Sequence, residues 1–162
     1  MSFAAPFVSS VHKVEDQWID YNGHFNMAYY NVIFDRAGDE AFLLLGLGPD
    51  YVKRTNCSFF TLEVHVSYLR ELHAGDAVKV TFRLLDHDAK RVHYVEQMYH
   101  AEANWLAAVS EHIVIHVDMT AKKSSPFPLG IRERIAMMLE SHQHLPIPCQ
   151  VGHKIGIPHA TK

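Results

Sequence analysis

The stretch Asp20-Tyr21-Asn22-Gly23-His24-Phe25-Asn26-Met27-Ala28-Tyr29-Tyr30 marks the point where an extended segment gives way to a helix. Residues 20–26 are rich in turn-forming types and are predicted to form an irregular loop. Asn26 is a suitable N-cap for a helix that starts at Met27. From Met27 to about Leu45, apolar residues recur every three or four positions, which predicts one long amphipathic helix. The apolar positions are Tyr30, Ile33, Phe34, Ala37, Ala41 and Leu44.

The segments on either side of this helix have patterns typical of β-strands. Residues 7–20 are predicted to form a first strand, and Gly46, Gly48 and Pro49 are expected to end the helix. Further strands are predicted over residues 58–70, 78–84, 92–98 and 105–117, with a hairpin loop at 86–90. The last of these strands is apolar on both faces, which predicts a central position in the sheet. A short helix over 129–142 and an irregular surface tail that includes Pro158 complete the chain.

This order of elements, one strand, one long helix and a run of antiparallel strands, predicts an α+β fold. The helix has a single apolar stripe and the sheet needs a cover. We therefore expect a five-stranded antiparallel sheet that wraps around the helix, which is the hotdog fold. A length of 162 residues predicts one domain over residues 1–162. Its core is expected over about 7–120, and the C-terminal helix and tail over 124–162.

The composition argues against several classes of function. A formal net charge of −3 without a basic patch predicts that nucleic acid is not a partner. No stretch approaches the roughly 18 apolar residues that cross a bilayer, so no membrane partner is expected. Cys57 and Cys149 form no disulfide framework and the first ten residues have no signal-peptide pattern, which together predict a cytoplasmic protein. Thirteen histidines raise the question of a metal, but no HExxH motif or Cys/His pair at ligand spacing exists. We predict no metal site and no cofactor.

The stretch from Asp20 to Tyr30 resembles the D-x-x-G-H-V-N-N-x-x-Y signature of hotdog thioesterases, in the 4-hydroxybenzoyl-CoA thioesterase-like group. The preceding strand, the helix that starts at the motif and the run Phe34-Asp35-Arg36-Ala37 agree with that group. A closer resemblance, to the betainyl-CoA thioesterase subgroup of carnitine catabolism, spans nearly the whole chain. It is carried by residues 18–24, 60–65, 88–93, 106–108 with Glu111, 116–118 and 152–158.

The resemblance implies an acyl-CoA thioesterase with Asp20 as its catalytic carboxylate. Asp20 would act as general base on water, or would attack the thioester directly to form a mixed anhydride, and both routes stay open. The Met27 backbone amide matches the family's oxyanion donor, and the free N–H groups of a helix start suit that role. His24 and Asn26 are candidates to hold the carbonyl or orient water, with a local turn network as the equal alternative. Gly23 suits a turn that brings the backbone close to the thioester.

The resemblance also implies a substrate, betainyl-CoA, whose products would be glycine betaine and CoA. Proteins hold a quaternary ammonium group with aromatic faces and a nearby carboxylate. Glu63 is the candidate carboxylate, with a solvated strand residue as the alternative interpretation. Lys90, Arg91, Lys122 and Lys123 are candidates for the CoA phosphates. The candidate aromatic residues are Tyr21, Phe25, Tyr30 and Phe60, which in other hotdog proteins often serve packing.

Alternative functions stay open. The chain is also compatible with a thioesterase for medium-chain or aromatic acyl-CoA, or with a non-catalytic acyl-CoA-binding hotdog protein. A hotdog hydratase is disfavoured, because its D-x-N-P-x-H motif needs proline in place of Gly23 and a histidine one residue after His24. One hotdog sheet leaves open edges and half a site, so a homodimer or homotetramer is expected.

Overall fold

The computed structural model describes residues 3–157, so Pro158 and the end of the predicted tail lie outside the described residues. The chain forms the long helix α1 (Met27–Leu44), the short helix α2 (Pro49–Thr55), the C-terminal helix α3 (Leu129–His142) and one 3-10 turn, η1 (Asp16–Trp18). The strands are β1 (Phe7–Val8), β2 (His12–Lys13), β3 (Cys57–Tyr68), β4 (Ala77–His87), β5 (Arg91–His100), β6 (Leu106–Asp118) and β7 (Lys123–Ser124).

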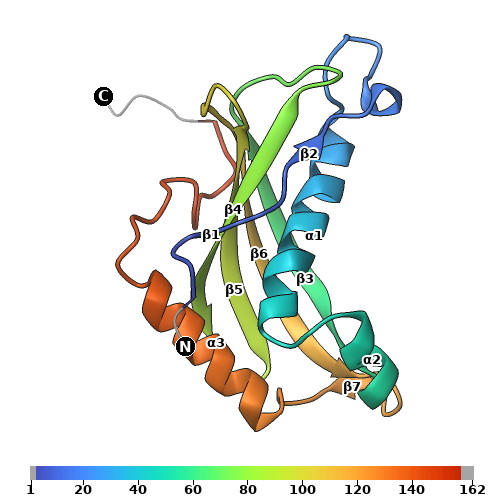
Figure 1. Cartoon of the computed structure of the whole chain (residues 1–162), viewed down its shortest axis with the longest axis vertical. Helices are drawn as coiled ribbons and strands as arrows, with labels where there is room; N and C mark the ends of the chain where they lie inside the picture. The colour runs from blue at the N-terminus through green and yellow to red at the C-terminus, as the bar shows by residue number, and fades with distance from the viewer. Residues whose placement is uncertain (1–2, 158–162) are drawn as a thin grey trace.

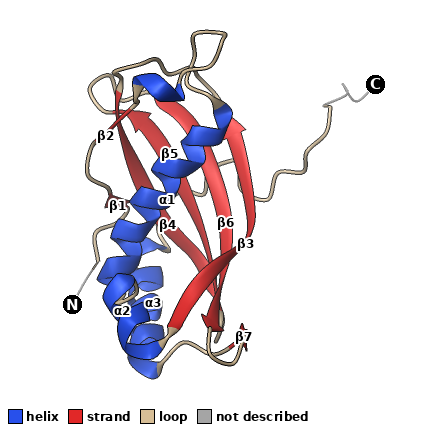
Figure 2. Ribbon diagram, turned by 90° about the vertical axis from the view of Figure 1, so that its right-hand side faces the viewer, coloured by secondary structure: helices blue, strands red, loops and turns tan. Residues whose placement is uncertain are grey.

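All strands pair antiparallel in one sheet. The order is β1-β4-β5-β6-β3, with β2 also paired to β4 and β7 to β6. In Figure 2, α1 lies across one face of this sheet, which curves behind it. The C-terminal tail lies on the other side of the sheet, at the left of Figure 1. The hotdog arrangement is therefore confirmed, with four of the five predicted strands present as the long strands β3 to β6 and with β1, β2 and β7 as strands of two residues each. The predicted central strand, β6, is an interior strand, although β5 occupies the middle of the order.

Helix α1 begins where the sequence predicts. The Asn26 side chain accepts a hydrogen bond from the Ala28 N–H at 3.0 Å, which caps the helix. Five of the six predicted stripe positions are buried, but Leu44 is 46% exposed, and its place in the core is taken by Leu45, just after the helix ends. The helix ends at this point, so the helical period no longer decides which side chain faces the sheet.

The predicted first strand is wrong as a continuous element. Residues 7–20 form β1, β2 and the turn η1 instead. The ladder to β4 is interrupted at Ser9, whose hydroxyl accepts the Val80 N–H at 3.0 Å in place of a backbone carbonyl. A side chain that replaces a main-chain acceptor ends regular pairing.

Helix α2 is not in the sequence prediction. The sequence predicts that Gly48 and Pro49 end the long helix, whereas Pro49 is the first residue of α2. Proline fits the first turn of a helix because the N–H that it lacks has no partner there. Gly48, with φ of +131°, supplies the turn between the two helices.

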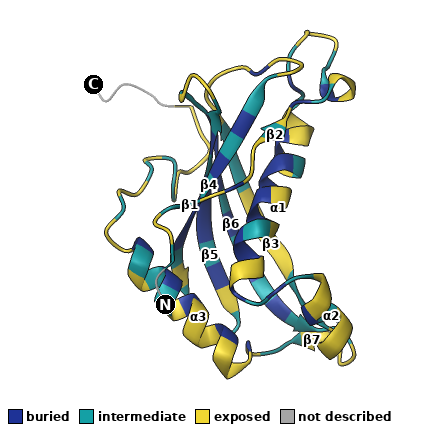
Figure 3. Cartoon of the chain, viewed as in Figure 1, coloured by how far each residue is buried: buried dark blue, intermediate teal, exposed yellow. Residues whose placement is uncertain are grey.

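The core consists of two apolar clusters stacked along α1. One surrounds Trp18, Phe34 and Met98, and the other surrounds Phe42 and Ile135. Figure 3 shows the buried positions where α1 and the sheet face each other. Within residues 3–157, no helix is long and apolar enough to cross a membrane.

A layer of polar side chains separates the two clusters. It consists of Glu96, Ser110 and His112, all buried on the sheet face that α1 covers. We refer to these three residues as the polar layer.

Candidate active site

The loop before α1 is a compact turn that presents Asp20 at the surface. Backbone bonds from Asn26 to Trp18 and from Asp20 to His24 close the loop, at 2.9 and 3.0 Å. Gly23 takes a left-handed φ of +79°, which favours glycine at this position. The half-buried Asp20 accepts the Asn22 N–H on Oδ1 at 2.8 Å. One carboxylate oxygen, Oδ2, is left without a hydrogen-bond partner among residues 3–157 and is available to a water molecule or a substrate.

The start of α1 provides a free donor beside this loop. The Met27 N–H is in the first helical position, where no intrahelical acceptor exists, and residues 3–157 supply no other acceptor. The Met27 carbonyl accepts a hydrogen bond from the Tyr68 hydroxyl at 2.9 Å, which fixes the helix start against the end of β3. A helix N-terminus with a free amide can stabilise an oxyanion.

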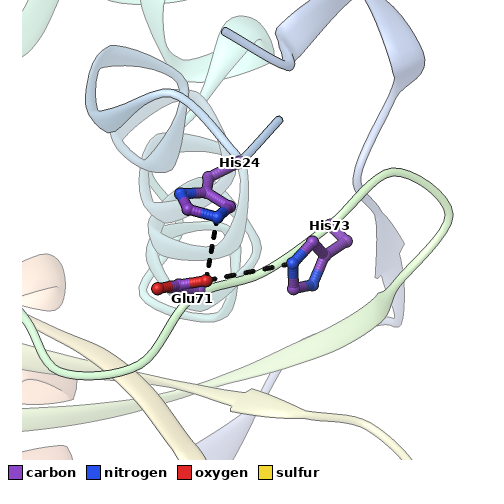
Figure 4. Close-up of side chains that lie close together, drawn as sticks. All are labelled: His24, Glu71 and His73. Atoms are coloured by element: carbon purple, nitrogen blue, oxygen red, sulfur yellow. Dashed lines mark ion pairs between the residues drawn. The ribbon is translucent and has the colours of Figure 1, made fainter. Parts of the chain in front are cut away.

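His24 lies in a cluster that the sequence does not indicate. Its Nε2 is 3.0 Å from Glu71 Oε2, and His73 Nε2 is 3.9 Å from the same oxygen. Figure 4 shows the three side chains converging from the Asp20 loop and the β3–β4 connection. Their potential ligand atoms lie within 4.8 Å of one another, so the structure brings together a set that could hold a metal ion. The sequence prediction of no metal site missed this set because its members are distant along the chain.

The candidate aromatic residues do not form one cage in this chain. Tyr21 is 98% exposed at the loop tip. Phe25 and Tyr30 are buried and stacked at 4.2 Å, and Tyr30 meets Tyr68 edge-on at 5.0 Å. Burial raises the pKa of Tyr30 to about 12. Phe25 and Tyr30 therefore pack in the core next to the Asp20 loop, while Phe60 lies on β3.

Phe60 and Glu63 face away from α1. Both pair with β6 residues on the outer face of the sheet, opposite Ile115 and Ile113. Glu63 lines a cleft of about 880 Å³ there, together with His65, His93, Glu111 and the tail residues Gly152–Ile155. Within one chain, the structure does not bring Glu63 or Phe60 together with Asp20.

The Glu111 carboxylate helps to attach the tail to this outer face, beside the stacked rings of His65 and His153. Glu111 accepts the Gly152 N–H at 2.7 Å and contacts His93 Nε2 at 2.7 Å.

The basic candidates for CoA phosphates lie at the far end of the sheet from the Asp20 loop, near β7 (Figure 1). Arg91 is paired with Asp88, and hydrogen bonds from its guanidinium lower the pKa of that carboxyl group to about 2. Lys90 is 3.4 Å from the Ser124 hydroxyl.

A second cleft, of about 420 Å³, opens between α1 and β3. It is lined by Asn31, Val32, Asp35, Thr61, Val64, Tyr94 and His112. This cleft reaches the polar layer, because His112 belongs to both. We refer to it as the α1–β3 cleft.

Comparison with known proteins identifies the family. A family model described as the thioesterase-like superfamily matches residues 14–135, which include the Asp20 loop, α1 and strands β3 to β6. The chain belongs to this superfamily.

Individual thioesterase relatives agree with this placement. The betainyl-CoA thioesterase of Pseudomonas aeruginosa is 36% identical over 88% of this chain and 89% of that protein. The L-carnitine dehydrogenase/betainyl-CoA thioesterase of Rhizobium meliloti is 32% identical over 89% of this chain, which spans only 29% of that longer protein. A hypothetical protein from Staphylococcus aureus, solved in complex with CoA, has a TM-score of 0.88 at 30% identity and covers 98% of this chain and 100% of its own. The resemblance to hotdog thioesterases and to the betainyl-CoA subgroup is confirmed.

Proposed function

We propose that this thioesterase hydrolyses betainyl-CoA to glycine betaine and CoA in carnitine degradation. The observation that carries the proposal is the 36% identity to a betainyl-CoA thioesterase over nearly the full length of both proteins. The loop supports it, since Asp20 has a free carboxylate oxygen and the helix that follows the loop starts with a free amide.

The residues of the loop suffice for thioester hydrolysis. In one route, Asp20 accepts a proton from water as the oxygen attacks the carbonyl carbon, and the Met27 N–H donates to the oxyanion. The carbon–sulfur bond then breaks, and the CoA thiolate takes up the proton. In the other, Asp20 attacks the carbonyl, expels the thiolate and forms an anhydride that water hydrolyses. In both routes Asn26 holds the helix start, while Gly23 and His24 shape the loop.

We further propose that the active form is a homodimer or a dimer of dimers. Strand β3 ends the order of the sheet, with no strand on its outer side among residues 3–157. Phe60, Leu62 and Tyr68 expose 49%, 56% and 43% of their surfaces along it. Exposed apolar residues on an edge strand favour pairing with a second copy. The two free cysteines are consistent with the cytoplasmic location that we also propose.

A panel of acyl-CoA esters with detection of the free thiol tests the function. Betainyl-CoA should exceed its neutral isostere, 3,3-dimethylbutyryl-CoA, in kcat/KM. Medium-chain and aromatic esters serve as the competing classes. If one of these is hydrolysed fastest, the substrate assignment is wrong and a thioesterase of different specificity remains. If no ester is hydrolysed while acyl-CoA binds, the chain is a non-catalytic acyl-CoA-binding protein.

A further inference from the structure

Two histidines and one glutamate meet beside the Asp20 loop. His24 Nε2 and His73 Nε2 lie 3.0 and 3.9 Å from the same carboxylate oxygen, Glu71 Oε2 (Figure 4). The two imidazole rings are nearly perpendicular, at 83°, with their centroids 5.6 Å apart. Within residues 3–157, this is the one set of three or more His, Cys, Asp or Glu side chains whose potential ligand atoms lie within 4.8 Å of one another. Two segments of the chain thus direct nitrogen donors at one carboxylate.

A buried main-chain contact fixes the spacing of these two segments. The Phe25 N–H donates to the Leu72 carbonyl at 2.9 Å, and both side chains are buried. His24 directly precedes Phe25, while Glu71 and His73 flank Leu72 in a segment without helical structure. Because Leu72 faces the core, its two neighbours are directed to the surface on the same side. The fold, rather than the ion pairs themselves, therefore brings the three side chains together.

A second carboxylate lies behind His73. Its Nδ1 is 3.9 Å from Asp76 Oδ2, and its backbone N–H donates to the same oxygen at 2.9 Å. A histidine that binds a metal through one ring nitrogen commonly has a carboxylate or carbonyl at the other, which fixes the orientation of the ring. Asp76 is placed to do this for a His73 that binds through Nε2.

The donor atoms select the kind of ion. Two imidazole nitrogens and one carboxylate oxygen suit zinc and the neighbouring divalent transition metals, whereas magnesium and calcium prefer oxygen ligands. Ligand atoms of a tetrahedral zinc ion are about 3.4 Å apart, because each lies about 2.0–2.2 Å from the metal. The separations of 3.0 and 3.9 Å are close to this value, and all three side chains are exposed enough to adjust by small rotations.

No arginine or lysine competes for this carboxylate in the part of the chain that the structure describes. The ion-pair partners of Glu71 there are the two histidines. Arg70, the adjacent cation in the sequence, is directed to the Trp105 ring, with its guanidinium carbon 4.2 Å from the ring centroid. The carboxylate is therefore available to a metal ion.

We propose that His24, Glu71 and His73 bind one zinc-class divalent ion, with a water molecule as the fourth ligand. The ion ties the Asp20 loop to the β3–β4 connection, since His24 belongs to the first segment and the other two ligands to the second. The His24 carbonyl accepts the Asp20 N–H at 3.0 Å, so a metal bond to His24 also restrains the backbone of Asp20. The ion takes no part in the reaction, whose base and oxyanion donor remain Asp20 and the Met27 amide. This site replaces the sequence prediction that no metal binds.

Zinc titration of the chelator-treated full-length protein, in competition with a chromophoric zinc indicator, tests the site. The wild type should bind one ion per chain more tightly than its remaining histidines do. Glu71→Gln and His73→Asn each remove one ligand at little change in size. Each should weaken this binding by at least about a hundredfold, since loss of an outer partner alone costs about 10- to 100-fold. Asp76→Asn keeps an acceptor for the His73 N–H and should weaken binding by about tenfold.

Adventitious binding is the competing explanation, because the chain has 13 histidines. His65→Asn is the matched control, since His65 and His153 also stack, with their centroids 6.0 Å apart, away from the proposed site. This variant should keep the wild-type affinity. Cobalt(II) in place of zinc should give the visible absorption of a four-coordinate ion in the wild type and lose it in Glu71→Gln. Equal zinc affinity in the wild type, Glu71→Gln and His73→Asn would overturn the assignment.

Thermal unfolding and hydrogen exchange test whether the ion ties the loop. Zinc at about a hundred times its Kd should raise the thermal midpoint of the wild type by about 5 °C or more, and leave that of His73→Asn unchanged. Without zinc the two proteins should unfold at the same temperature, which shows that the variant is folded. Zinc should also slow amide exchange in residues 20–26 of the wild type several-fold, because opening of the loop then requires release of a ligand. Tight zinc binding that leaves this exchange unchanged would refute the tie between the two segments.

Discussion

Replacing Asp20 by asparagine separates the chemical role of this side chain from its structural role. Among residues 3–157, the only hydrogen bond of the side chain is accepted on Oδ1 from the Asn22 N–H at 2.8 Å. An amide oxygen accepts the same bond, and the two side chains have nearly the same shape. What Asp20→Asn removes is the basic and nucleophilic oxygen, Oδ2.

The two consequences differ in size. Retention of the turn bond limits the change in folding stability to less than about 1 kcal/mol, the value of one such bond. Loss of the base or nucleophile should lower kcat by at least about a hundredfold, which is about 2.7 kcal/mol of activation free energy. Stability should therefore be almost unchanged while turnover nearly disappears.

The assay compares kcat on betainyl-CoA with the thermal midpoint of the same preparation. Asp16→Asn, in the exposed first position of the neighbouring 3-10 turn, is the matched control and should change neither quantity. Near-wild-type turnover by Asp20→Asn would refute the assignment of the catalytic carboxylate. A collapse of the thermal midpoint would refute the claim that the turn needs only the Oδ1 acceptor.

Four further outcomes are expected. Asn26→Ala should lower stability by about 1 kcal/mol, or 2–4 °C in the thermal midpoint, because it removes the α1 cap, while Asn26→Asp should keep the cap. Leu62→Lys on β3 should shift the light-scattering mass towards the monomer, whereas Val11→Lys, at the other edge and no less exposed, should not. Dialysis against a chelator should leave turnover unchanged, since Asp20 and the Met27 amide need no Lewis acid; a loss restored by zinc and absent in His73→Ala would instead make a metal at His24, Glu71 and His73 part of the reaction. Because the pKa of Glu96 is raised in the folded state, the folded state loses stability relative to the unfolded state as pH rises above the ordinary value of 4.5. The thermal midpoint of the wild type should therefore fall relative to that of Glu96→Gln on going to neutral pH, and a constant difference between the two would contradict this.

Capping residues and the spacing of apolar residues predicted most of the secondary structure, because both depend on interactions between residues that are close together in the sequence. The cap at Asn26, the stripe along α1 and the range of α3 agree with the structure. The prediction failed at Ser9 and at Pro49. Ser9 can continue a strand ladder or interrupt it, and Pro49 can end one helix or start another. In both places the packing of the neighbouring elements decides between the two outcomes.

The sequence contains a signal for the polar layer. Val92, Tyr94, Glu96 and Met98 alternate on one face of a strand, and Glu96 is the one charged residue among them. An acid at an apolar position of a strand is a candidate for a buried functional group. Its partners on α1 and β6 are distant in the sequence, so the pattern alone does not indicate a cleft.

The fold, the family and the position of Asp20 at the start of the long helix could be predicted from the sequence, because the order of elements and the motif at residues 20–30 are visible along the chain. Which side chains share a face and a cavity became known only from the packing of the elements in space. This packing placed Glu63 outside the sheet, Glu96 beneath α1, and Glu71 and His73 beside His24. These positions follow from strand register and from packing between distant segments, where a shift of one residue moves a side chain to the other face of the sheet.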